Sequence, residues 1–184
     1  MADSRSARGV VVNEWLGPVG RELREGVGAE LRADAEETER LVALAARRRR
    51  TLGDVAASLL ARGDRVAVDV PGRRFTGTVV HAGEDLLRLR AAGGPVDVNL
   101  RGPVRLTVVE RATAGGAERS AGAPSFRSRL SELELEGATV ELGDGGDGLV
   151  GRIDVVAVDH VVLIDPTGAE RYVARAAVTY VRVR

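Results

Sequence analysis

Two stretches of the chain decide its fold: TLGDVAASLLARGDRVAV at residues 51–68 and SFRSRLSELELEGATVEL at residues 125–142. In the first, Thr51 and Asp54 form a capping-box pattern at the start of a short helix. Gly63 stands where a helix ends in a left-handed residue, and Gly137 has the same place in the second stretch. After each glycine the apolar residues alternate with polar ones, which indicates a β-strand. Each stretch therefore predicts a short helix followed by a strand.

The same pattern continues when the chain is compared with itself at a shift of 74 residues, without a gap. The matched pairs fall on turns and core-facing positions: Thr51/Ser125, Gly63/Gly137, Val66/Val140, Gly72/Gly146, Gly77/Gly151, Asp85/Asp159, Leu89/Leu163, Gly94/Gly168, Arg101/Arg175 and Val104/Val178. We interpret this as two copies of one folding unit. The alternative is two unrelated all-β domains of similar length.

Between residues 66 and 108, five short runs of alternating apolar residues are separated by glycine or proline. A short helix followed by five such strands predicts a small closed barrel, which removes exposed sheet edges. The expected fold is mainly β with helices: a long N-terminal amphipathic helix, then two tandem five-stranded Sm-like or SH3-like barrels, each preceded by a short helix. The expected boundaries are a disordered tail at 1–15, the long helix at 16–50, barrels at 51–111 and 125–184, and a flexible Gly/Ala/Ser-rich linker at 112–124.

The predicted long helix has an apolar stripe longer than a small domain can cover. We expect this stripe to pack on another helix, which can come from a second copy of the chain. The candidate oligomerisation residues on this stripe are Leu23, Val27, Leu31 and Val42.

Composition excludes several classes of protein. The 27 basic residues, all of them arginine, balance 27 acidic ones, so net charge alone cannot attract a polyanion. Cysteine is absent, which excludes disulfides, thiol catalysis and cysteine-type zinc sites. Aromatic residues make up only 3%. No apolar run is long enough to span a membrane, and the start of the chain does not resemble a secretory signal, so we expect a cytoplasmic protein without membrane contact.

Catalysis has little support in the sequence. His81 and His160 do not match each other under the 74-residue shift and have no metal-ligand spacing, so we expect surface or loop histidines. The segment from Asp144 to Gly148 fits a Gly/Asp hairpin turn better than a calcium loop. We expect a non-enzyme with no catalytic residues, no metal and no cofactor.

The strands resemble the Sm-like barrels, a superfamily that includes the Sm and LSm proteins and bacterial Hfq. The residues that match the first signature are Val66-x-Val68, Gly77-x-Val79 and Asp85, and again Val140-x-Leu142, Gly151-x-Ile153 and Asp159. Those that match the second are Leu100-Arg101-Gly102, and in part Ala174-Arg175-Ala176. Other SH3-like barrels share much of this patterning.

The resemblance implies a ring that binds single-stranded RNA, with Arg101, Arg175, Asp85 and Asp159 near the bases. The aromatic or methionine platform that stacks a base in the family is absent here. Two readings stay open for these residues. Each aspartate could instead cap its own backbone after a turn, and each arginine could pair with a neighbouring acid.

Arg47, Arg48, Arg49 and Arg50 form the densest basic cluster of the chain. They end the predicted helix, where cations favour the helix dipole, or they contact phosphates. Two function classes follow from the sequence. The first is a non-catalytic protein that binds single-stranded RNA. The second is an assembly scaffold, a homo-oligomer formed through the N-terminal helix or the barrel edges.

Overall fold

The computed structural model describes residues 35–113, 115–116, 122–146 and 148–184. Contacts divide the chain into two units, Met1–Arg49 and Arg50–Arg184. In the first unit, residues 35–49 form a helix whose described side chains are all exposed. The expected long helix is corrected accordingly, because the described part is helical only over 35–49 and ends at the arginine run. The expected tail at 1–15 and helix residues 16–34 lie outside the described residues.

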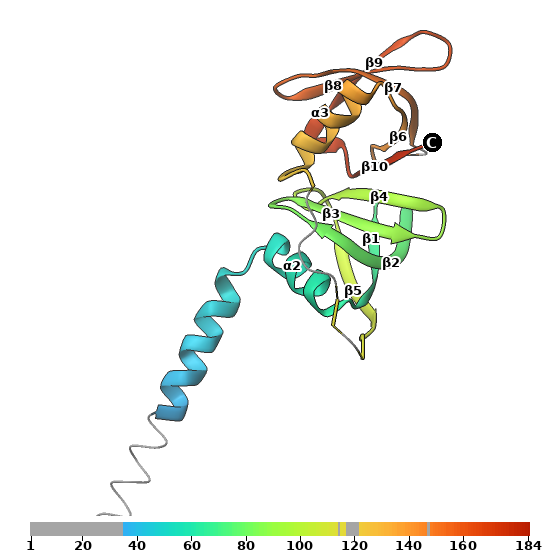
Figure 1. Cartoon of the computed structure of the whole chain (residues 1–184). Coiled ribbons are helices and arrows are strands. Elements are labelled where there is room, and N and C mark those ends of the chain that lie inside the picture. The colour runs from blue at the N-terminus through green and yellow to red at the C-terminus, as the bar shows by residue number, and fades with distance from the viewer. Residues whose placement is uncertain (1–34, 114, 117–121, 147) are drawn as a thin grey trace, which may run out of the picture. The chain divides into compact units, whose positions relative to one another are not determined.

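The second unit contains two similar series of elements (Figure 1). The first series is α2 (Leu52–Arg62), β1 (Arg65–Val70), β2 (Arg73–Ala82), β3 (Leu86–Ala91), β4 (Gly94–Asn99) and β5 (Arg105–Glu110). The second is α3 (Phe126–Glu136), β6 (Thr139–Gly143), β7 (Leu149–Val156), β8 (His160–Ile164), β9 (Glu170–Ala174), the 3-10 turn η1 (Arg175–Ala177) and β10 (Tyr180–Val183). We call these series the first and the second half of the unit.

The helix signals act as the sequence predicts. The Thr51 side chain accepts a hydrogen bond from the Asp54 N–H, and the Asp54 carboxylate accepts one from the Thr51 N–H. Ser125 caps α3 in the same way through the Ser128 N–H. Gly63 and Gly137 end the two helices with φ of 75° and 62°, in the region that glycine adopts without strain.

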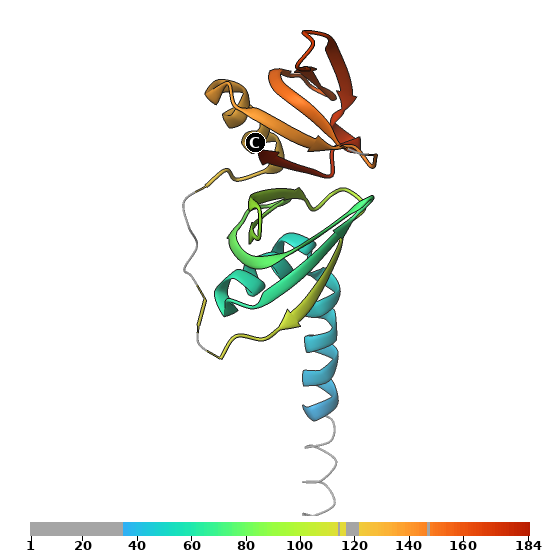
Figure 2. The same cartoon turned by 90° about the vertical axis from the view of Figure 1, so that its right-hand side faces the viewer.

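The prediction of two closed barrels is wrong. The described strands form one open ten-stranded antiparallel sheet in the order β5-β1-β2-β3-β4-β10-β6-β7-β8-β9. The two halves join where β4 pairs with β10, with Val98 opposite Tyr180 and Asp97 opposite Val181 (Figures 1 and 2). This pairing satisfies the edges of both strands, so neither half has to close on itself. The free edges of the sheet are β5 and β9.

Each half has its own hydrophobic core, and each core takes one side chain from the other half. Tyr180 of β10 lies in the first core, where its ring meets that of Phe75 edge to face at 4.9 Å. Leu86 of β3 lies in the second core. Both side chains are fully buried. Separating the halves would expose both, so the junction is part of the packing of each half.

The gap-free shift of 74 residues fails after β8. Leu87 pairs with Val98, but its equivalent Val161 pairs with Val173, one residue beyond the expected partner. The cause is a longer β8–β9 connection, in which the Asp165 N–H donates to the Ala169 carbonyl. A one-residue insertion in a hairpin moves every later residue to a new position. Arg175, which matches Arg101 at the 74-residue shift, therefore lies one position away from the place of Arg101.

Candidate nucleic-acid interface

A pocket of about 540 Å³ opens where the loops of the two halves meet. Its walls come from the loop before β3, the end of β4, the start of α3, the loop before β8, and η1. The lining residues are Glu84, Asp85, Asn99, Arg101, Ser125, Phe126, Arg127, Val158, Asp159, Arg175 and Ala176. The structure thus brings Asp85, Arg101, Asp159 and Arg175 into one concave site, although they are far apart in the sequence.

Asp85 connects the two halves. Its Oδ1 accepts a hydrogen bond from the Phe126 N–H at the start of α3 (2.7 Å), and its Oδ2 lies 3.1 Å from Arg101 Nε. Its carbonyl accepts from the Leu100 N–H at 2.8 Å. Both carboxylate oxygens therefore have partners within the protein, and the N–H that Asp85 accepts from belongs to the start of α3 in the second half rather than to its own turn.

Arg101 is held but not buried. Its Nη2 donates to Glu84 Oε1 at 2.7 Å, and its side chain is 69% exposed. The Arg101 N–H donates to the Oδ1 of Asn99, whose Nδ2 donates to the Val178 carbonyl of the second half. Asn99 is buried and fixes the backbone that carries the arginine. An exposed ion pair of this kind is worth ~0–1 kcal/mol, so a ligand can compete for the guanidinium.

The sequence comparison predicts that Arg175 holds the place of Arg101 in the second half, and this prediction is wrong. The Arg175 N–H donates to the Asp159 carbonyl at 2.7 Å, as that of Leu100 does to the Asp85 carbonyl, so Arg175 takes the place of Leu100. Its Nη1 is buried and has no hydrogen-bond partner among the described residues. A buried hydrogen-bond donor without a partner costs the fold about 1–3 kcal/mol.

Asp159, the second aspartate, differs from Asp85 in its exposure and its partners. The carboxylate of Asp159 is 86% exposed, and its Oδ1 lies 2.7 Å from His160 Nδ1. The hydrogen bond and charge of His160, with a smaller contribution from Arg175, lower the pKa of Asp159. This carboxylate stays ionised at neutral pH and faces solvent, where it can accept a hydrogen bond from a ligand.

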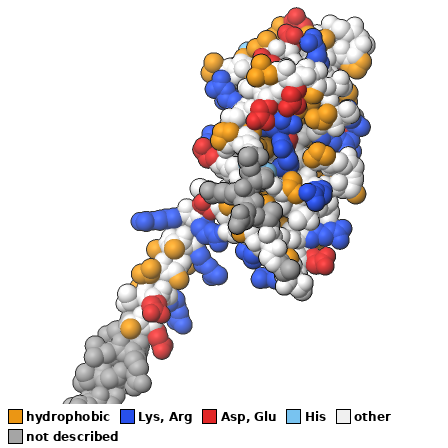
Figure 3. Space-filling model, viewed as in Figure 1, with side chains coloured by type: hydrophobic (Ala, Val, Ile, Leu, Met, Phe, Trp, Pro, Cys, Tyr) orange, Lys and Arg blue, Asp and Glu red, His pale blue; other side chains and the backbone are white. Residues whose placement is uncertain are grey.

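Three arginines and three acids line the pocket, so its formal charge is zero. Phe126 is the aromatic residue of the lining, and its ring is buried. On the face that Figure 3 shows, basic and acidic side chains of the second unit are interspersed. The site is suited to recognition by directed hydrogen bonds rather than by a general field or by stacking on an open ring.

Three lining residues that shape the site were not predicted from the sequence: Glu84, Asn99 and Arg127. Asn99 had a detectable signal, because it is a polar residue between the apolar Val98 and Leu100 at a strand end. Glu84 and Arg127 carry no local signal. They are polar residues near turns, as many exposed residues are.

The other candidates lie outside the pocket. Arg47, Arg48, Arg49 and Arg50 are exposed and are not part of its lining. Arg50 donates from Nη2 to Ser58 Oγ of α2. Of the proposed oligomerisation residues, Val42 is 64% exposed on the helix of residues 35–49, where further hydrophobic side chains are exposed (Figure 3). Leu23, Val27 and Leu31 lie outside the described residues.

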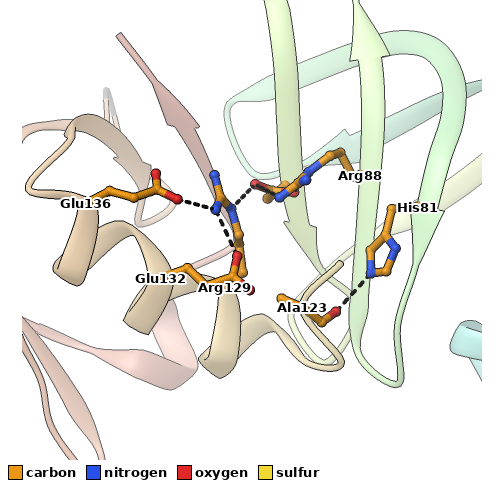
Figure 4. Close-up of polar contacts among 7 residues, drawn as sticks. His81, Arg88, Ala123, Arg129, Glu132 and Glu136 are labelled. Atoms are coloured by element: carbon orange, nitrogen blue, oxygen red, sulfur yellow. Dashed lines mark hydrogen bonds and ion pairs between the residues drawn. The ribbon is translucent and has the colours of Figure 1, made fainter. Parts of the chain in front are cut away.

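His81 differs from the expectation of a surface histidine. It is buried in β2, and its Nε2–H donates to the Ala123 carbonyl at 2.8 Å (Figure 4). The contact holds the end of the 112–124 segment against the first half. Among the described residues, no three His, Asp or Glu side chains gather as metal ligands would.

No protein-family model matches the chain, and no curated protein matches it in sequence. Over the described residues, no helix has both the length and the apolar content needed to cross a membrane.

Proposed function

We propose that the chain is a non-catalytic protein that binds single-stranded RNA in the pocket between its halves, in the cytoplasm. The observation that carries the proposal is the convergence of Arg101, Arg127 and Arg175 on one concave site, where Arg175 Nη1 has no hydrogen-bond partner among the described residues. Guanidinium groups offer planar, bidentate donors for phosphates and base edges. The resemblance to Sm-like proteins, and the reading of the halves as two copies of one unit, support the same proposal.

The test is a titration of labelled single-stranded RNA at two salt concentrations, with Arg101→Ala/Arg175→Ala beside the wild type. The matched control is Arg152→Ala/Arg171→Ala, which removes the same charge from exposed positions outside the pocket. We expect salt-sensitive binding that the first variant loses at least tenfold and the control retains. Equal weakening of RNA binding in both variants would show that general charge attraction, and not this pocket, holds the RNA.

A second candidate function, assembly, is favoured by the two free edges of the sheet. At the junction, β4 of the first half pairs with β10 of the second half. In the same geometry, β9 of one copy of the chain can pair with β5 of another copy. In the second half Tyr172 takes the place of Asp97. The residue after Asp97 is Val98, which pairs with Leu87, and the residue after Tyr172 is Val173, which pairs with Val161. Leu87 and Val161 are equivalent positions of the two halves.

Leu106 takes the place of Val181, because these two residues pair with the equivalent positions Val68 and Leu142. The predicted contact between copies is therefore Leu106 opposite Tyr172. Tyr172 is 67% exposed on its free edge strand, as an unpaired contact residue would be.

Cysteine substitution tests this register cleanly, because the chain contains no cysteine. Leu106→Cys and Tyr172→Cys proteins, mixed and mildly oxidised, should form a disulfide-linked pair, since opposite residues have Cβ atoms ~4.5–5.5 Å apart. Thr107→Cys with Tyr172→Cys is the control, because neighbouring strand residues point to opposite faces. Equal crosslinking in both mixtures, or none in either, would contradict this edge pairing.

A further inference from the structure

A second pocket, of about 330 Å³, lies at the other end of the β3–β4 hairpin. Its polar lining consists of Arg65 of β1, Arg74 and Thr76 of β2, and Arg182 of β10. The rest of the lining is the glycines of the hairpin turn and four apolar residues, Phe75, Ala91, Ala92 and Val96. No aspartate or glutamate belongs to its described lining. This distinguishes it from the first pocket, in which acids and arginines are equal in number.

Two of the three arginines are only loosely paired. Arg65 Nη1 lies 3.9 Å from Glu110 Oε2, and Arg74 Nε lies 3.6 Å from Asp69 Oδ1. Both arginine side chains are more than half exposed. Pairs at such distances on the surface contribute little and are screened by salt, so these guanidinium groups can take another anion.

The third arginine belongs to a cluster with excess positive charge. Arg182 donates from Nε and Nη2 to Glu141 Oε2, at 3.0 and 2.8 Å. The same carboxylate also pairs with Arg73 and Arg184, so one acid serves three arginines. Burial acts to raise the pKa of Glu141, but hydrogen bonds from Tyr180 and Arg182 and the nearby positive charges lower it overall. Glu141 is therefore ionised at neutral pH, and the cluster keeps its positive excess.

The turn of the hairpin leaves space for a ligand. Gly94 has φ of 106°, and a Cβ added to it would meet nothing within 4 Å. A Cβ on Gly93 would meet only Arg182 Nη1, at 3.8 Å. The rim beside the arginines is thus bare backbone, which a bulky anionic group can approach closely.

The second half has no such site. The residues that correspond to Arg65, Arg74 and Gly93 at the 74-residue shift are Thr139, Gly148 and Thr167. Both arginines are lost, and the longer β8–β9 connection carries Asp165 instead. The arginine cluster is therefore a property of the first half alone and does not follow from the shared arrangement of strands.

We propose that this pocket binds a phosphate group, with Arg65, Arg74 and Arg182 as donors. Guanidinium forks match phosphate oxygens, and three of them around an opening whose described lining contains no acid define a site for that anion. The strand β4 separates this pocket from the first one, a distance of roughly 20 Å at ~3.4 Å per residue. The phosphate can belong to a polynucleotide held at both pockets, which rests on the proposed function, or to a small phosphorylated molecule, which does not.

The test compares Arg65→Ala/Arg74→Ala with the Arg152→Ala/Arg171→Ala control, which removes the same charge elsewhere. Arg182 is left intact because it belongs to the buried ion cluster. Two probes are used: labelled single-stranded RNA, and inorganic phosphate followed by ³¹P NMR. Circular dichroism and thermal unfolding establish that both variants fold.

With RNA, the slope of log K against log salt should fall by about 1.4 in the Arg65→Ala/Arg74→Ala variant, since each phosphate contact on a single strand contributes ~0.7. The control should keep its slope. Phosphate that binds the wild type but not the variant, with no RNA binding by the wild type, would support the pocket and contradict the proposed RNA function. An unchanged slope together with unchanged phosphate binding would overturn the phosphate site, even if Arg101 and Arg175 prove essential for RNA.

Discussion

At the scale of single residues, Glu84 decides how available the first pocket is. It neutralises Arg101 through a 2.7 Å ion pair, whereas Val158 stands at the corresponding position of the second half, where Arg175 Nη1 has no partner among the described residues. The two sides of the pocket are thus unequal: Arg101 pairs with Glu84 and Asp85, whereas no carboxylate of the described residues lies within ion-pair distance of Arg175.

Glu84→Gln should therefore strengthen RNA binding, by up to about fivefold, because it releases a pair worth ~0–1 kcal/mol. Glu136→Gln is the control, since Glu136 is a half-exposed acid that pairs with Arg129 outside the pocket. Fluorescence anisotropy measures both. A rise of the same size in the two variants would show only the effect of net charge.

Tyr180 is the second residue with a specific predicted effect. Its hydroxyl donates to Glu141 Oε1 at 2.6 Å inside the protein. Tyr180→Phe should lower the free energy of unfolding by about 1–3 kcal/mol, because Glu141 loses a buried donor. Urea unfolding measures the change, and Tyr172→Phe, at an exposed tyrosine, should change it by less than about 0.5 kcal/mol.

The same tyrosine predicts how stability depends on pH. Burial, together with the hydrogen bond to Glu141, raises the pKa of Tyr180 to about 12. The unfolded chain releases this proton near pH 10 and the native state holds it to about pH 12, so the contribution is complete below pH 10 and is lost as the pH rises between these values. Tyrosinate absorbance in a Tyr172→Phe background reports Tyr180 alone. Ionisation of the folded protein near pH 10 would contradict the buried contact.

At the scale of elements, α3 is capped from the other half of the molecule. Ser125 caps it locally, and Asp85 accepts from the Phe126 N–H across the pocket. Asp85→Ala should cost about 1 kcal/mol, as lost caps do. Asp159→Ala removes an exposed carboxylate and should cost less than about 0.5 kcal/mol. Chemical denaturation separates the two, and equal costs would contradict the unequal roles of the aspartates.

Local signals predicted the elements because their causes lie within a few residues. Thr51 and Asp54 form a capping box, Gly63 ends its helix with positive φ, and the alternation from Val66 onward gives strands. Long-range pairing has no such signal. Nothing near Val98 specifies that β4 pairs with β10, so the sequence could not exclude two closed barrels. The burial of His81 escaped prediction for the same reason, since its partner Ala123 comes from a distant segment.

The candidate site was predicted in part. The resemblance to Sm-like barrels pointed to Asp85, Asp159, Arg101 and Arg175, and all four side chains line the pocket. The equivalence of Arg101 and Arg175 failed, because one added residue in the β8–β9 connection shifts the chain. Alignment without a gap could not detect that insertion.

At the scale of the whole molecule, the second unit depends on its central junction. Asp97 lies there, buried, between Arg88 of its own half (Nε to Oδ1, 2.6 Å) and Arg129 of α3 (Nε to Oδ2, 3.0 Å). Arg129 also donates to Glu132 and Glu136 (Figure 4). Burial acts to lower the pKa of Arg129, but its bonds to Glu132 and Asp97 raise it overall.

Because each core contains a side chain from the other half, the wild type should unfold in one cooperative transition. Asp97→Ala should lower the free energy of unfolding by about 3 kcal/mol, because it removes the carboxylate that pairs with the largely buried Arg88 and one of the three carboxylates that pair with Arg129. The same substitution should also split the unfolding transition in two, because the two halves then unfold separately. Calorimetry checks both effects, and two transitions already in the wild type would contradict a shared junction.

The most direct test of the central claim is ultraviolet crosslinking of the wild-type protein to single-stranded RNA, with the crosslinked peptides identified by mass spectrometry. We expect crosslinks to peptides that carry the pocket wall, around Glu84–Arg101 and Val158–Arg175, and their loss in Arg101→Ala/Arg175→Ala. Crosslinks confined to the arginine run at Arg47–Arg50, or a pattern unchanged by the double substitution, would contradict it.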